Sequence, residues 1–173
     1  MAGLLRYAAP STVFSTPTVN GYRRFRPNSL APDRATWAHD HRGVMVRLLG
    51  GPGDPATRLE NRIGEPAANP YLFIASRIAA GLAGIDQQLD PDPSDDEPYT
   101  APRTMLPKSL PEALDALEQE PLFRREFGEV FIDYFLKLKR TEAGRFAQWL
   151  TDAGESAASE PTQWEQNEYF DFF

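Results

Sequence analysis

The chain contains no cysteine. This absence excludes a disulfide framework, a metal site built on thiolates and a cysteine nucleophile, and it suits a reducing compartment. The sequence also has no apolar run that approaches the length of about 20 residues needed for a membrane-spanning helix. The apolar stretch in its first ten residues is too short and too interrupted for a signal peptide. We therefore expect a cytoplasmic protein without a membrane partner.

Lysine is absent from the first third of the chain. All nine basic residues among residues 1–63 are arginine, against four acidic residues, whereas residues 64–173 hold nine basic and twenty-one acidic residues. Arginine binds carboxylate or phosphate in two places and keeps its charge when it is desolvated, so this set favours anion recognition in a partly dry site. Nucleic acid is a weaker reading, because DNA-tracking surfaces usually include lysine and the acidic remainder would repel DNA.

The length of 173 residues, 41% of them hydrophobic, is enough for one ordinary domain with a buried core. Residues 2–9 are expected to form the end of a helix that Pro10 stops, and residues 11–33 read as a loop. The sequence then predicts three strands, the last two joined by a glycine- and proline-rich turn at residues 50–55: Ala35–His39, Gly43–Leu49 and Thr57–Ile63.

The second half of the chain has helical patterns. Asn69 is a good N-cap and Pro70 suits the first helical position, so a helix is predicted to start there. Its apolar side chains are expected to be largely buried: Leu72, Phe73, Ile74, Ile78, Leu82 and Ile85. Residues 86–108 are rich in aspartate and proline and predict an exposed loop.

Further helices are predicted at residues 110–118, about 121–127 and 129–150, followed by an aromatic terminal helix from Trp164. Together these patterns predict an α+β fold. Part of an antiparallel sheet carries the arginines, and a mostly helical C-terminal half follows.

Several charged residues can be interpreted either as structural or as functional. Arg58, Glu60 and Arg62 share one face of the predicted strand, and a solvated face with cross-paired charges is the commoner explanation of such a run. His39 and His41 would share a face on another strand. No further ligand cluster lies near them in the sequence, so a histidine metal site is only weakly indicated.

Five stretches taken together favour the functional reading. They are NGYRRF (residues 20–25), PNSLAP (27–32), DHRGVMVR (40–47), RLENR (58–62) and ANPYL (68–72). In this order and spacing they resemble motifs of the glutamine synthetase superfamily, ATP-dependent ligases that join the γ-carboxyl of glutamate to an amine. The ending WEQNEYF (164–170) is also similar to the C-terminus of many members, so that the resemblance covers nearly the whole chain.

The resemblance implies roles for six side chains and a requirement for ATP with Mg²⁺ or Mn²⁺. Arg24 and Arg62 would bind the glutamate substrate, Arg42 would be the catalytic residue at the transferred phosphate, Arg42, Arg47 and Arg58 would bind ATP, and Glu60 would be a metal ligand. Such a set suits phosphoryl transfer, which needs positioning and charge neutralisation more than covalent help.

The resemblance also implies what is missing. Residues 1–173 would form the C-terminal portion of a catalytic domain, with Met1 an internal residue or the first residue of an expressed fragment. The remaining metal carboxylates and a metal histidine would belong to the missing N-terminal part of the same protein. Members form ring-type homo-oligomers with active sites between subunits, so the isolated chain is expected to be inactive. The alternatives are a stand-alone interaction or regulatory module and a catalytically dead homologue.

Two positions depart from the family pattern. Leu30 stands where ammonia-using members carry the loop glutamate that accepts a proton from ammonium, and Pro55 stands where a nucleotide-side lysine is common. Leucine can neither accept a proton nor attract a cation. These departures fit ligases that attach larger or more hydrophobic amines, or a member that has lost activity.

Overall fold

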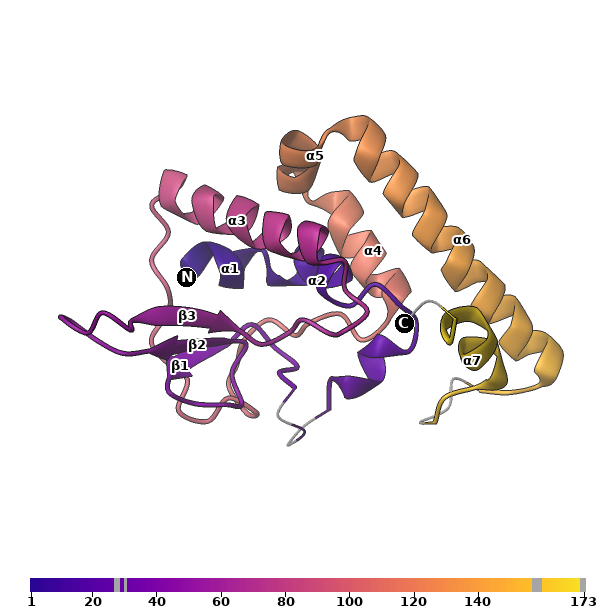
Figure 1. Ribbon diagram of the computed structural model, residues 1–173, viewed down its shortest axis with the longest axis horizontal. Coiled ribbons are helices and arrows are strands. Elements are labelled where there is room, and N and C mark those ends of the chain that lie inside the picture. The colour runs from indigo at the N-terminus through magenta and orange to yellow at the C-terminus, as the bar shows by residue number, and fades with distance from the viewer. Residues whose placement is uncertain (27–28, 30, 157–159, 172–173) are drawn as a thin grey trace.

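The computed structural model describes residues 1–26, 29, 31–156 and 160–171. A small sheet lies on one side of the helices α1, α2 and α3 (Figure 1). Helices α4, α5 and α6 extend away from the sheet, and α7 lies against the C-terminal part of α6. Among the described residues, no helix is both long and apolar enough to span a bilayer.

The sheet contains the three predicted strands in the order β1 (Trp37–His39), β2 (Val46–Leu49) and β3 (Arg58–Asn61). Strands β2 and β3 are antiparallel, as predicted, but β1 runs parallel to β2, so the sheet is mixed. The chain reverses after β1 at Asp40, whose φ of 48° lies in the left-handed region that aspartate tolerates better than most residues. Strand patterns alone carry no information on this direction.

The N-terminal helices differ from the prediction at Pro10. Helix α1 covers Ala2–Arg6, and α2 covers Ala8–Ser15, so Pro10 is the third residue of a helix and does not end one. A proline in the first helical turn removes an N–H that has no acceptor within the helix, and it is tolerated there. The predicted loop therefore starts only after Ser15, and it contains the 3₁₀ turn η1 at Gly21–Arg24.

Helix α3 (Pro70–Asp86) starts where the sequence predicts, because the Asn69 side chain accepts hydrogen bonds from the backbone N–H groups of Tyr71 and Leu72 at 3.0 and 3.3 Å. Its small residues pack against α1. A Cβ on Gly84 would lie only 2.6 Å from the Gly3 Cα, so the two helices approach closely.

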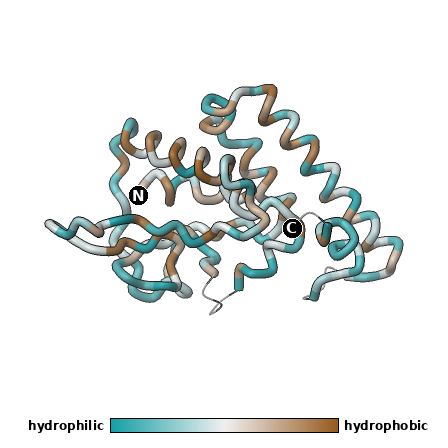
Figure 2. The backbone as a smooth tube through the Cα atoms, viewed as in Figure 1, coloured by the Kyte–Doolittle hydropathy of each residue, from teal (hydrophilic) through white to brown (hydrophobic). Residues whose placement is uncertain are grey.

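The expected burial of the large α3 side chains is wrong for four of them. The exposed fractions are 55% for Ile74, 56% for Ile78, 55% for Leu82 and 72% for Ile85. The helix turns its small-residue face toward α1 and its large-residue face outward, and Figure 2 shows hydrophobic residues recurring along it. We call these four residues the α3 stripe. Monomeric proteins seldom leave such a stripe uncovered.

We predict that the isolated chain associates with itself through the α3 stripe. Burying one isoleucine is worth about 1.5–3 kcal/mol, so a second copy or another apolar surface should cover it. Multi-angle light scattering of residues 1–173 should give a mass above that of the monomer. Ile74→Lys with Ile78→Lys should shift the mass toward the monomer, whereas Val130→Lys, at an exposed apolar residue of another helix, should not. A monodisperse wild-type monomer would indicate an autonomous fold.

The helices of the C-terminal half are confirmed as α4 (Leu110–Gln119), α5 (Pro121–Phe127), α6 (Glu129–Ala153) and α7 (Gln163–Tyr169). They share a core with α2, in which the Phe14 ring lies 5.2–5.5 Å from the rings of Phe123, Phe127 and Phe135. This core connects the helical half to the segment that leads into η1.

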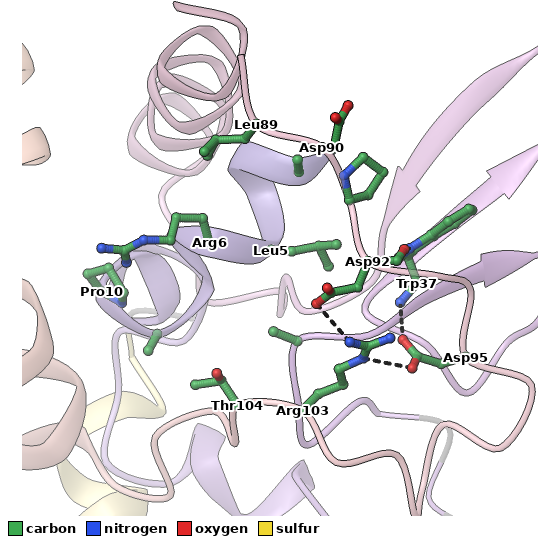
Figure 3. Close-up of a pocket in the computed structure, with 14 residues that line it drawn as sticks. Leu5, Arg6, Pro10, Trp37, Leu89, Asp90, Asp92, Asp95, Arg103 and Thr104 are labelled. Atoms are coloured by element: carbon green, nitrogen blue, oxygen red, sulfur yellow. Dashed lines mark hydrogen bonds and ion pairs between the residues drawn. The ribbon is translucent and has the colours of Figure 1, made fainter. Parts of the chain in front are cut away.

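The aspartate- and proline-rich segment after α3 is bonded to strand β1, and Figure 3 shows the contact at Asp95. Asp95 is buried, and it accepts hydrogen bonds from Arg103 Nε at 2.8 Å and from the Trp37 backbone N–H at 3.2 Å. The Asp95 N–H donates to the Trp37 carbonyl at 2.8 Å. The segment thereby covers the outer edge of β1, and a strand edge covered in this way is protected from pairing with another chain. A cavity of about 510 Å³ lies beside it.

Candidate active site

The β2–β3 hairpin gathers the charged side chains on one face of the sheet. In its register Arg47 lies opposite Glu60, and Leu49 lies opposite Arg58. Side chains of directly paired residues point to the same face and those of successive residues alternate, so Arg47, Arg58 and Glu60 share a face while Val46 turns into the core. Trp37 pairs with Val46, so the cavity of Figure 3 lies on the opposite side from Arg47.

Glu60 lies between two guanidinium groups. Its Oε2 is 3.2 Å from Arg47 Nη1, and its Oε1 is 3.6 Å from Arg62 Nη1. The Arg47 and Arg62 side chains are each only 16% exposed, against 40% for Glu60. The charges do cross-pair, as the structural reading expects, but the arginines are too buried for a simple solvated face. We call these three residues the Arg–Glu–Arg cluster.

Arg47 also contacts Asp40, which the sequence analysis did not identify as a site residue. The hydrogen bond from Arg47 Nη2 and the charge of Arg47 lower the pKa of the Asp40 carboxyl, and Arg42 adds a smaller effect. Arg42 follows in the turn after Asp40; it is exposed and has no hydrogen bond or ion pair within the described part of the chain. Its guanidinium is therefore available to an anion.

Arg24, on η1, is bonded to the backbone just after β3. Its Nη1 donates a hydrogen bond to the carbonyl of Ile63, the residue that follows Arg62, at 2.9 Å. Burial lowers the pKa of Arg24, and the charge of Glu65 partly offsets this shift. Arg24 and Glu65 line a cavity of about 500 Å³ together with Tyr169.

Glu65 is a second acidic residue that sequence reasoning missed. Burial raises the pKa of its carboxyl, although a hydrogen bond from Thr18 at 3.1 Å and the charge of Arg24 oppose the shift. No local sequence pattern identifies Glu65 as a site residue. The Thr18 hydroxyl that binds its carboxylate lies in a distant segment of the chain, before η1.

The remaining predicted residues lie at the periphery or outside the described residues. Arg58 is exposed and donates to the Ala56 carbonyl at 3.0 Å, and Pro55 is exposed in the turn that precedes β3. Leu30 lies outside the described residues. The structure thus brings Arg47, Glu60 and Arg62 together, and it bonds Arg24 to the carbonyl of the residue after Arg62. Arg42 and Arg58 are exposed.

The histidine reading is not supported. Strand β1 ends at His39, so His41 does not share a strand face with it, and His41 Nδ1 instead accepts a hydrogen bond from the Gly43 N–H at 2.9 Å. Within residues 1–26, 29, 31–156 and 160–171, no three His, Cys, Asp or Glu side chains group to hold a metal ion. Glu60 fits one oxygen ligand of a hard divalent ion, and the other ligands would have to come from elsewhere.

The family model of the glutamine synthetase catalytic domain matches residues 1–166. The chain belongs to this family. It is 53% identical over 173 residues to a γ-glutamylanilide synthase of Acinetobacter sp, covering 97% of this chain and 34% of the relative. It is 35% identical over 153 residues to a γ-glutamylethanolamide synthetase of Streptomyces coelicolor, covering 88% and 33%. The resemblance inferred from the motifs is thereby confirmed.

Solved structures of a protein called GmaS have the same fold. The ligand-free form has a TM-score of 0.73 at 32% identity, covering 98% of this chain and 37% of GmaS. A complex of GmaS with ADP has a TM-score of 0.74 at 31% identity. The chain spans about a third of the length of the curated relatives it matches.

Proposed function

We propose that the whole protein is an ATP- and divalent-metal-dependent ligase that joins the γ-carboxyl of glutamate to an amine through γ-glutamyl phosphate. Residues 1–173 would supply the C-terminal portion of its catalytic domain. The observation that carries the proposal is the Arg–Glu–Arg cluster, half-enclosed on one sheet face, with Arg24 bonded to the carbonyl of Ile63, the residue after Arg62. Membership of the glutamine synthetase family supports the same conclusion.

The cluster suits the first half-reaction, in which the glutamate carboxylate attacks the terminal phosphorus of ATP and ADP leaves. Both partners are anions, so the protein must neutralise charge and hold the reacting groups in line. Arg24 and Arg62 would hold the glutamate, Arg47 and Arg58 the nucleotide, and the exposed Arg42 the phosphoryl group in transit.

Glu60 would hold a Mg²⁺ or Mn²⁺ ion. Such an ion supplies further neutralisation of phosphate charge when it is bound. Without the ion, Glu60 pairs with Arg47 and Arg62, which gives the two largely buried guanidinium groups a carboxylate partner. The same pairing holds the two guanidinium groups in place for the substrates.

The amine acceptor is proposed to be aromatic or otherwise apolar. An aromatic amine is uncharged at neutral pH because its lone pair is delocalised into the ring, so it needs no loop carboxylate to attract it or to remove a proton before attack. Leu30 in place of the family's glutamate agrees with this chemistry, and so does the likeness to a protein named for γ-glutamylanilide. The amine would displace phosphate from γ-glutamyl phosphate.

Phosphate release by the full-length protein tests the proposal. Release should require glutamate, ATP, a divalent metal and an amine, and an amine panel should include ammonia, ethanolamine and aniline. Residues 1–173 alone should release none, because Glu60 is one carboxylate where a two-metal site needs several. No release by the full-length protein with any amine would favour a non-catalytic interaction module or a dead homologue.

A ring-type homo-oligomer, with sites shared between subunits, belongs to the same proposal. The α3 stripe supports it only in part, because the rest of the same protein could equally cover these residues. The mass of the full-length protein in solution tests the assembly separately from its activity.

A further inference from the structure

Helix α7 starts with a reciprocal cap. The Thr162 hydroxyl accepts a hydrogen bond from the Glu165 N–H at 3.3 Å, and the Glu165 carboxylate accepts one from the Thr162 N–H at 2.6 Å. Such a capping box satisfies backbone groups at the helix start. The Glu165 side chain is only 1% exposed, which is more burial than a cap requires.

The buried Glu165 carboxylate also forms an ion pair with η1. Arg23 donates hydrogen bonds to both Glu165 oxygens, from Nη2 to Oε2 at 2.8 Å and from Nη1 to Oε1. Burial raises the pKa of Glu165, but the hydrogen bonds from Arg23 and Thr162 outweigh it, so that the net pKa is lowered and the charged pair is maintained. A bidentate pair of this kind fixes orientation as well as distance.

Tyr169, at the other end of α7, holds the start of the same segment. Its hydroxyl donates to Glu142 on α6 at 2.6 Å and accepts a hydrogen bond from the Val19 N–H at 3.2 Å. Helix α7 is therefore hydrogen-bonded to Val19 and to Arg23, which lie on either side of residues 20–22. Helix α7 is itself seated on α6, where the Trp164 ring lies 5.1 Å from the Phe146 ring.

The residue after Arg23 is Arg24, which faces the cavity of about 500 Å³ that Tyr169 also lines. The Arg24 guanidinium also donates a hydrogen bond to the Ile63 carbonyl. We propose that Glu165 and Tyr169 are positioning residues, which hold the turn Gly21–Arg24 so that Arg24 is aimed at the substrate carboxylate. The inference rests on the proposed function for the identity of that carboxylate, and it assigns a role to the WEQNEYF ending.

Steady-state kinetics of the full-length enzyme test the inference with Glu165→Gln. The loss of one charged pair should raise the KM for glutamate about tenfold, while kcat and the KM for ATP stay within about twofold. Glu168→Gln is the matched control, because Glu168 lies on the same helix but pairs with Arg145 on α6, and among the described residues it has no hydrogen bond or ion pair with η1. An equal effect in Glu168→Gln, or an equal rise in the KM for ATP, would overturn the positioning role.

Hydrogen–deuterium exchange of the full-length protein gives a readout that does not depend on activity. Glu165→Gln should speed exchange in the peptide covering residues 19–26 by about tenfold relative to wild type, and Glu168→Gln should leave it unchanged. Unchanged exchange in Glu165→Gln would overturn the inference even in an active enzyme. If the wild type shows no glutamate-dependent turnover, the proposed function fails and this exchange experiment still decides whether α7 holds η1.

Discussion

Glu60→Gln in the full-length enzyme is expected to lower kcat by about 100- to 1000-fold, the range found when one group that stabilises transition-state charge is removed. The amide keeps the size of the side chain but loses the negative charge that would bind the metal ion. It also leaves Arg47 and Arg62 without the carboxylate that now lies 3.2 and 3.6 Å away. The loss should therefore exceed that from a weakened ATP contact alone.

The measurement is glutamate-dependent phosphate release at saturating ATP over a range of Mn²⁺ concentrations. Higher Mn²⁺ should recover part of the activity if Glu60 is a ligand. Glu118→Gln is the control, because Glu118 also pairs with an arginine, Arg140, but lies in the helical half. A kcat for Glu60→Gln within about threefold of wild type would remove Glu60 from the site.

Leu30→Glu should shift the preference of the full-length enzyme toward ammonia. Burying a leucine-sized apolar contact contributes about 1.5–3 kcal/mol, which corresponds to about one to two decades in favour of an alkyl or aromatic amine. Ammonia gains nothing from that surface, and ammonium has no carboxylate to attract it. The quantity to measure is the ratio of kcat/KM for ammonia to that for the best organic amine.

Leu30→Met is the control for this ratio, since methionine keeps the apolar volume and adds no charge. The ratio should rise in Leu30→Glu and stay near the wild-type value in Leu30→Met. If the wild type already prefers ammonia, or if the glutamate variant leaves the ratio unmoved, then the loop does not select the amine. A screen of amines with the wild type should come first, because it names the organic substrate for the comparison.

The sequence by itself determined the local elements and the family. The turn at residues 50–55 and the alternation at Arg58 and Glu60 predict the β2–β3 hairpin, and the Asn69–Pro70 cap predicts the start of α3. These features depend on a few neighbouring residues, so a short stretch of sequence is enough to predict them. The motifs identify the family because they occur in the family's order and spacing.

Only the tertiary structure decided the pairings between distant segments. The mixed direction of the sheet, the outward turn of the α3 stripe and the burial of Arg47 depend on what packs on each face. The same holds for the bond between Arg23 and Glu165, which are 142 residues apart. Periodicity shows that a helix has an apolar side but not which side meets α1, because close approach of small residues competes with burial of large ones. In α3 the small residues pack inward, and the large apolar residues of the α3 stripe remain exposed.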